Sequence, residues 1–97
     1  MAFKLIVSKR AQSEIENAMV YYAEINKTLA LRFYSCVEQV YDILKINPFY
    51  KKIHNDFRIV PIGTFPFNII FHIEEANKTI KILSCFHTSR NTINYPR

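Results

Sequence analysis

The side chains best suited to chemistry gather in the C-terminal part of the sequence. His87, Arg90 and Tyr95 follow one another closely, and Arg58 precedes them on a different expected strand. A histidine can accept or donate a proton near neutral pH. Arginine can hold phosphate oxygens, and tyrosine can stack on a base or donate a proton. These residue types would suit a phosphodiester substrate or a charged partner.

A basic segment, Lys51, Lys52 and His54, adds to this group. The net charge is +5, with five basic against four acidic residues up to Val40 and eight against four after it. An excess of positive charge favours RNA, DNA or an acidic protein segment as a partner. The alternative is that Lys51 and Lys52 form a solvated loop and the charge only maintains solubility. The expected target-binding residues are Lys51, Lys52, His54, Arg58, Arg90 and Arg97.

Several classes of protein are excluded by what the sequence lacks. The single glycine, Gly63, is too few for a glycine-rich phosphate loop. Cys36 and Cys85 lack zinc-ligand spacing, so we expect no metal and no cofactor, and two reduced thiols. No apolar run reaches the roughly 18–20 residues of a membrane span, and we identify no secretory signal. These features predict a cytoplasmic protein with no membrane association.

The first half predicts a strand followed by a helical hairpin. Phe3 to Val7 is a short apolar run, and Ser8 can cap a helix from Lys9 to about Asn26. Thr28 can cap a second helix, which ends at Asn47-Pro48 because proline disfavours helical geometry in the residue before it. Apolar residues recur at helical spacing at Ala11, Ile15, Ala18, Met19, Tyr22 and Ile25, and again at Ala30, Phe33, Val37, Val40 and Leu44.

The second half changes to strand periodicity. Strands are expected over 57–62, 66–74 and 79–86, and turns at Gly63-Thr64 and Ala76-Asn77 separate them. Pro61 lacks an N–H, so its strand should lie at an edge or carry a bulge there. The sequence therefore predicts one α+β domain over residues 1–97. Its order is strand–helix–helix–three-strand meander, and its helical hairpin packs on one face of a small antiparallel sheet.

This order of elements, together with several local segments, resembles the RelE/ParE superfamily of bacterial toxins, and the ParE branch most. The resemblance covers nearly the whole chain. Each segment is only a loose match, and it is their order and spacing that is specific. The matching segments are Val7-Ser8 with Ala11, Leu44 with Pro48, Phe57-Arg58-Ile59, Phe65-Pro66-Phe67 followed by Ile69-Ile70-Phe71, and Ile82-Leu83 through His87 and Arg90.

The resemblance implies the toxin component of a type II toxin–antitoxin system, which inhibits growth and is neutralised by a cognate antitoxin protein. ParE-like members act on DNA gyrase. RelE-like members cleave messenger RNA on the ribosome without a metal. A non-toxic homologue that only binds nucleic acid is a third reading. The exposed aromatic residues Tyr21, Tyr34 and Phe49 are candidates for antitoxin contact.

If the chain were a ribonuclease, the resemblance would make His87 the acid or base. Arg58 and Arg90 would be phosphate clamps, and Tyr95 a stacking or proton-donating group. RNA-cleaving relatives place an arginine in the strand that here reads Phe67-Asn68-Ile69-Ile70, so this chain departs from their pattern. Structural roles are the alternative. His87 would bond to backbone, Tyr95 would pack on the sheet, and Arg58 would pair with Glu74 or Glu75.

Overall fold

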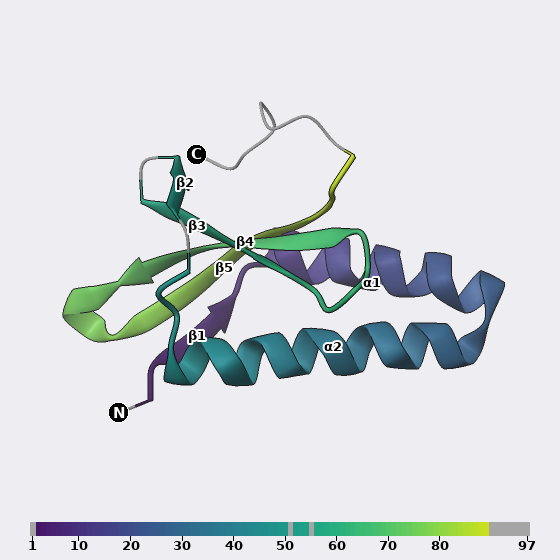
Figure 1. The fold of residues 1–97 in the computed structure, drawn as a ribbon, viewed down its shortest axis with the longest axis horizontal. Helices are drawn as coiled ribbons and strands as arrows, with labels where there is room; N and C mark the ends of the chain where they lie inside the picture. Colours follow the sequence, from purple (N-terminus) through teal and green to yellow (C-terminus); the bar gives the residue numbers. More distant parts are fainter. Residues whose placement is uncertain (1, 51, 55, 90–97) are drawn as a thin grey trace.

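The computed structural model describes residues 2–50, 52–54 and 56–89. Two helices pack against a five-stranded sheet, in the expected strand–helix–helix–strands order (Figure 1). The elements in chain order are β1 (Lys4–Val7), α1 (Lys9–Ile25), α2 (Lys27–Ile46), β2 (Lys52–His54), β3 (Phe57–Pro61), β4 (Phe67–Glu74), the short 3₁₀ helix η1 (Glu75–Asn77) and β5 (Thr79–His87).

Side-chain caps fix the ends of the helical hairpin. The Ser8 hydroxyl accepts a hydrogen bond from the N–H of Ala11, as the sequence predicted. The Thr28 cap was wrong. Asn26 ends α1 and also caps α2, because its side-chain oxygen accepts from the N–H of Thr28 at 2.7 Å. One residue therefore serves both helices, which keeps the turn short and holds them antiparallel.

The sheet has the order β1-β5-β4-β3-β2 and is mixed. The predicted antiparallel meander is confirmed as β3, β4 and β5. The expectation of a purely antiparallel sheet was wrong, because β1 pairs with β5 in parallel. The hairpin returns the chain over the sheet before β3 begins, so β1 and β5 run in the same direction. Strand β2, which the sequence analysis treated as a loop, pairs only with Phe57 and Arg58. It stops short of Pro61, which therefore lies on an unpaired edge of β3 as predicted.

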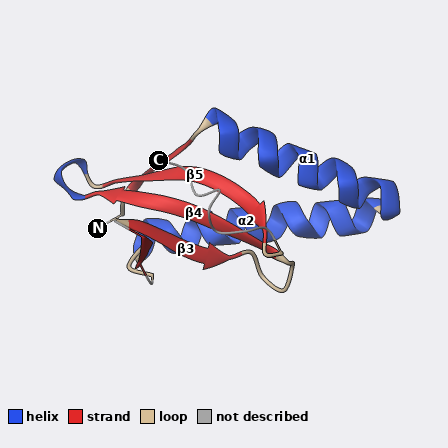
Figure 2. Cartoon of the chain, turned by 90° about the horizontal axis from the view of Figure 1, so that it is seen from above, coloured by secondary structure: helices blue, strands red, loops and turns tan. Residues whose placement is uncertain are grey.

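The hydrophobic core fills the space between the hairpin and one face of the sheet. Every buried apolar position predicted on α2 belongs to it: Ala30, Phe33, Val37, Val40 and Leu44. The tip of the hairpin projects beyond the strands at one end in both views (Figures 1 and 2). Among the described residues, no helix is long and apolar enough to cross a membrane.

Strand β5 carries one extra residue relative to β4. The pairing changes from Ile70–Ser84 to Phe71–Ile82, so Leu83 has no partner on β4. Such a bulge bends a strand and changes the direction of the side chains beyond it. The residues after Leu83 form the wall of the largest cleft described below.

Candidate binding site

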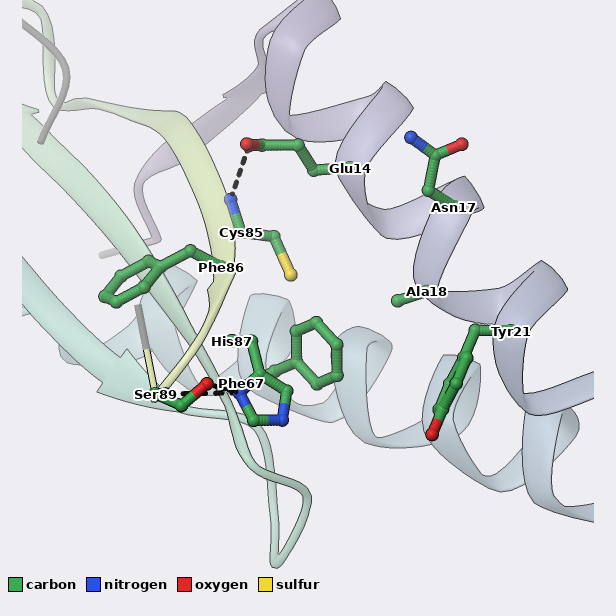
Figure 3. Close-up of a pocket in the computed structure, with 9 residues that line it drawn as sticks. All are labelled: Glu14, Asn17, Ala18, Tyr21, Phe67, Cys85, Phe86, His87 and Ser89. Atoms are coloured by element: carbon green, nitrogen blue, oxygen red, sulfur yellow. Dashed lines mark hydrogen bonds between the residues drawn. The ribbon is translucent and has the colours of Figure 1, made fainter. Parts of the chain in front are cut away.

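A cleft of about 640 Å³ lies between α1 and the C-terminal end of β5 (Figure 3). Glu14, Ala18 and Tyr21 recur every three or four residues, so they lie on the side of α1 that faces the strand. Phe67 of β4 forms part of the floor. The complete lining is Glu14, Asn17, Ala18, Tyr21, Phe67, Cys85, Phe86, His87 and Ser89.

The N-cap of the first helix, Ser8, and one side chain of that helix, Glu14, hold the bulged part of β5 in place. The Ser8 hydroxyl donates to the carbonyl of Leu83 at 3.1 Å. The carboxylate of Glu14 accepts from the Ser84 hydroxyl at 2.8 Å and from the N–H of Cys85 at 3.0 Å (Figure 3). A carboxylate is a strong acceptor, and these two donors belong to buried residues. Glu14 therefore attaches α1 to the wall of the cleft.

Replacing Glu14 with alanine should lower the free energy of unfolding by about 2–3 kcal/mol, because two buried donors lose their acceptor. Glutamine keeps one acceptor oxygen without the charge, and should cost about half as much. Urea denaturation monitored by circular dichroism measures both. Glu16→Ala is the matched control, since Glu16 is exposed and accepts a hydrogen bond from the exposed Gln12. Equal stability of Glu14→Ala and Glu16→Ala would contradict this role.

His87, a predicted site residue, lies in this cleft in a defined orientation. Its ring packs edge-on against Phe67, with 5.2 Å between the ring centroids. Its Nδ1 accepts the backbone N–H of Ser89 at 3.1 Å and lies 2.7 Å from the Ser89 hydroxyl. Since Nδ1 accepts, the neutral ring carries its proton on Nε2. The backbone contact predicted for His87 as a structural role is thus present, and Nε2–H remains a donor.

Arg58 has a structural contact that the sequence analysis did not foresee. Its Nη1 donates to the backbone carbonyl of Tyr50 at 2.6 Å, and its guanidinium lies 5.5 Å from the centroid of the Phe49 ring. Phe49 in turn packs edge-on against Phe3 at 6.0 Å. Arg58 thereby fastens the segment between α2 and β2 to the sheet.

The alternative of an ion pair between Arg58 and Glu74 or Glu75 was wrong, because Arg58 pairs with neither carboxylate within the described residues. Glu74 pairs instead with Lys81 at 3.2 Å, on the neighbouring strand. Its carboxylate also accepts from the side-chain amide of Asn77 at 2.6 Å. The Asn77 hydrogen bond and Lys81 hold the pKa of Glu74 below its usual range. Glu74 therefore serves the β4–β5 turn.

Lys52 and Arg58 line a second, smaller cleft of about 200 Å³ with His72. Two carboxylates, Asp56 and Glu75, line it as well, and the Lys52 ammonium lies 3.6 Å from Asp56. Lys51, Arg90, Tyr95 and Arg97 lie outside the described residues, as does the His54 side chain, so their predicted roles stay predictions.

The structure does not bring Arg58 and His87 together. Arg58 pairs with Phe71 across the sheet, whereas His87 pairs with Phe67. Four residues of β4 separate those two levels, which is roughly 13 Å at about 3.3 Å per residue. The two side chains belong to different clefts.

Tyr41, on α2, carries a buried hydroxyl group. Its buried hydroxyl oxygen has no hydrogen-bond partner within the part of the chain that the structure describes. Burial raises the pKa of Tyr41 to about 12, so it stays protonated at neutral pH. Among the same residues, no group of three metal-ligating side chains could hold a metal ion.

The sequence analysis identified His87 but missed Glu14 and Asn17. The predicted exposure of Tyr21, Tyr34 and Phe49 is confirmed. Glu14 was not named as a candidate site residue. Its spacing carried a signal, however, because it follows the buried Ala11 by three residues and precedes the buried Ala18 by four. A carboxylate within an apolar stripe requires a partner.

Comparison with known proteins identifies the family. Residues 5–92 match the family model described as the ParE toxin of the type II toxin–antitoxin system parDE. The chain belongs to the ParE toxin family. A comparison with curated proteins found no significant match. The ParE assignment agrees with the resemblance of the local segments, and places the chain within the RelE/ParE superfamily.

Solved structures share the fold of this ParE-family chain at low sequence identity. The chromosomal ParDE toxin–antitoxin system from P. aeruginosa superposes with a TM-score of 0.74 and 17% identity, over 91% of this chain and 98% of that one. The RelBE2 toxin–antitoxin complex from Mycobacterium tuberculosis gives 0.63 and 12%, over 90% and 99%. The isolated E. coli RelE toxin gives 0.57 and 12%, over 95% and 90%. At these identities the likeness concerns the fold alone.

Proposed function

We propose that this chain is the toxin of a type II toxin–antitoxin pair, that a cognate antitoxin neutralises it, and that it inhibits growth by acting on DNA gyrase rather than by cutting RNA. The family model supports the toxin role. Similar structures are toxin–antitoxin complexes, which supports an antitoxin partner.

The separation of Arg58 from His87 is the observation that supports gyrase, rather than RNA, as the target. RNA cleavage by 2′-hydroxyl attack needs cations on the developing charge of the phosphate, close to the acid and base. Within residues 2–50, 52–54 and 56–89, no lysine or arginine lines the cleft that holds His87. The guanidinium of Arg58 already binds Tyr50 and Phe49. The loss of one such stabilising group costs about 3–4 kcal/mol of transition-state free energy.

Messenger RNA cleavage is the second candidate, and the smaller cleft favours it. Lys52, Arg58 and His72 line that cleft together, so cationic groups do converge there. Asp56 and Glu75 share the same lining and would repel a phosphate. These carboxylates make the smaller cleft a weaker RNA-cleavage site, and the experiment below tests RNA cleavage directly.

The test is inducible expression of the chain in a bacterium without its antitoxin. Samples taken within minutes are assayed for cuts in messenger RNA and for the DNA-damage response. We expect growth arrest with a DNA-damage response and intact messages, and inhibition of purified gyrase by the purified chain. Phe33→Asp, which places an unpaired carboxylate at a fully buried position and should not fold, controls for the burden of expression.

Two other outcomes would contradict the proposal that the chain acts on gyrase. Codon-phased cuts in messages without DNA damage would overturn the gyrase target in favour of the ribonuclease. Normal growth with steep salt-dependent binding to RNA or DNA would indicate a non-toxic nucleic-acid-binding homologue.

A further inference from the structure

Three lysines meet where the first strand, the end of the second helix and the turn between β4 and β5 come together. The N–H of Phe3 donates to the carbonyl of Lys45, in the last turn of α2, at 2.8 Å. The N–H of Lys4 donates to the carbonyl of Lys78, which ends η1, at 2.8 Å. These segments lie at the end of the molecule opposite the projecting tip of the helical hairpin (Figures 1 and 2). We call this region the basic corner: Lys4, Lys45, Ile46, Phe49 and Lys78.

The lysines of the basic corner have no carboxylate partner among the residues that the structure describes. All three are exposed, and none of the ion pairs between described residues includes one of them. Of the nearby carboxylates, Glu74 pairs with Lys81 and Glu75 lines the smaller cleft. Asp42 lies one turn before Lys45 on α2 and forms no ion pair with it. Positive charge therefore exceeds negative charge here, which attracts an acidic partner.

Two exposed apolar side chains lie beside these lysines. Ile46, the last residue of α2, is 78% exposed, and Phe49, three residues further on, is 56% exposed. The Phe49 ring is nonetheless held in place, because Phe3 packs edge-on against it at 6.0 Å and the guanidinium of Arg58 lies 5.5 Å from its centroid. An apolar side chain that is exposed but already ordered loses little entropy when a partner covers it. Such side chains are typical anchors of protein interfaces.

The backbone at Lys78 gives an independent reason to assign this lysine a role in binding. Lys78 has φ +48°, and its N–H donates to the carbonyl of Glu75 at 3.1 Å. Among the described residues, no other residue with a side chain has a positive φ. Glycine adopts this conformation freely, whereas a side chain is strained there. Backbone strain is concentrated at functional sites. A partner that contacts the ammonium group explains the lysine better than the stability of the turn does.

The combination of charge with exposed apolar surface favours a protein partner over a nucleic acid. Lysines bind phosphate, but single-stranded nucleic acid also needs planar side chains on which its bases stack. Ile46 has no planar group, and Arg58 already lies over the Phe49 ring. Protein interfaces combine apolar anchors with a charged rim, and the basic corner has both.

We propose that the basic corner is the surface with which the chain holds its target protein, and that the target presents an acidic surface there. Carboxylates of the target pair with Lys4, Lys45 and Lys78, and apolar side chains of the target cover Ile46 and Phe49. The corner is distinct from the cleft between α1 and β5, because the first and last residues of β5 are roughly 26 Å apart at about 3.3 Å per residue. The proposal rests on the proposed function, because it takes DNA gyrase as the target.

A matched pair of charge-removing variants tests the lysines. Lys45→Gln with Lys78→Gln removes two charges from the basic corner, and Lys27→Gln with Arg32→Gln removes two exposed charges from the start of α2, at the hairpin tip. The measurement is inhibition of supercoiling by purified gyrase over a series of salt concentrations. At low salt, half-inhibition should need about tenfold more of the corner variant, and less than about twofold more of the tip variant. The difference should shrink as salt rises, because salt screens exposed charges.

Lys78→Gly separates binding from folding. Glycine adopts a positive φ without strain, so this chain should unfold at the same or a higher urea concentration than the unaltered chain. It lacks the ammonium group, so half-inhibition of gyrase at low salt should need about threefold more of it. Loss of inhibition without loss of stability cannot come from misfolding, and would support the proposal.

Ile46→Gln tests the apolar part. Glutamine is a good helix former and Ile46 is mostly exposed, so the fold should be kept. Half-inhibition should need about fivefold more of this variant, as for an interface residue that contributes to binding. Leu31→Gln is the matched control, since Leu31 is 68% exposed near the start of the same helix, and it should change inhibition by less than about twofold. Equal effects of the two substitutions would overturn the proposal.

Failure of this inference is separable from failure of the proposed function. If the unaltered chain does not inhibit gyrase, the proposed function fails, and the inference fails with it. If the unaltered chain inhibits gyrase and all the corner variants inhibit it equally well, only the basic corner is overturned. Affinity for duplex DNA alone, measured in parallel by fluorescence anisotropy, tests the other class of partner. If the corner variants lose DNA affinity to the same degree as they lose inhibition, the corner binds nucleic acid, which also overturns the proposal.

Discussion

Replacing Phe33 with alanine is expected to lower the free energy of unfolding by about 3–5 kcal/mol. Phe33 is 0% exposed and belongs to an aromatic cluster. Its ring lies 5.2 Å from that of Phe65 and 5.4 Å from those of Phe67 and Tyr22. Alanine would leave a cavity bordered by three rings that cannot all move inward together. Much of the total stability of about 5–15 kcal/mol typical of a domain would be lost.

Chemical denaturation with fluorescence and circular dichroism would measure this change. Tyr34→Ala is the matched control, since Tyr34 follows Phe33 on the same helix but is exposed, and should change stability by less than about 1 kcal/mol. The cluster also reaches the binding cleft, because Phe67 contacts both Phe33 and His87. A Phe33→Ala chain that unfolds at the same denaturant concentration as the Tyr34→Ala chain would contradict the central place of this ring.

The helices and the three-stranded meander were predictable because they are determined by local patterns. Apolar spacing of three or four residues defined both helices, and the Ser8 cap marked where the first begins. The Thr28 cap was wrong, although Thr28 and Asn26 are both good cap residues. The choice between them depends on the angle at which the hairpin turns, and the sequence does not encode that angle locally.

The sheet's edges were not predictable in the same way. Strand β1 pairs with β5 across most of the chain, and no local pattern states which distant strand an edge strand joins. Strand β2 has three residues, too few to show an alternation of period two. The bulge at Leu83 is likewise a tertiary feature, fixed by Ser8 and Glu14 from another element.

The same distinction applies to the candidate site. His87 was found from its residue type and its place at a strand end, and these are properties of the sequence. The distance between His87 and Arg58 depends on strand register, which sets His87 beside the first residue of β4 and Arg58 beside its middle. The chemistry of a site therefore depends on strand register, because a short shift in register would change which side chains meet. Register is the property that the pattern of a single sequence defines least.

The second large effect should come from Gly63→Ala, at about 2–5 kcal/mol. Gly63, the only glycine in the chain, has φ +52° in the turn between β3 and β4. Any L-residue with a side chain is strained there by roughly 1–2 kcal/mol. A Cβ at this position would also lie 2.9 Å from the Sγ of Cys36 on α2, which is closer than van der Waals contact allows. Relieving that overlap, by turning the Cys36 side chain or by moving the helix, costs about 1–3 kcal/mol more.

A double-mutant cycle with Cys36→Ala separates the two contributions. Alanine at position 36 removes Sγ and leaves only a Cβ, 3.5 Å away, which is ordinary contact. In that background Gly63→Ala should cost only about 1–2 kcal/mol, the backbone contribution alone. Urea denaturation of the four chains gives the coupling energy directly. A coupling near zero would mean that the turn moves away from α2 freely, and that the close packing of Gly63 on Cys36 contributes nothing to the stability of the fold.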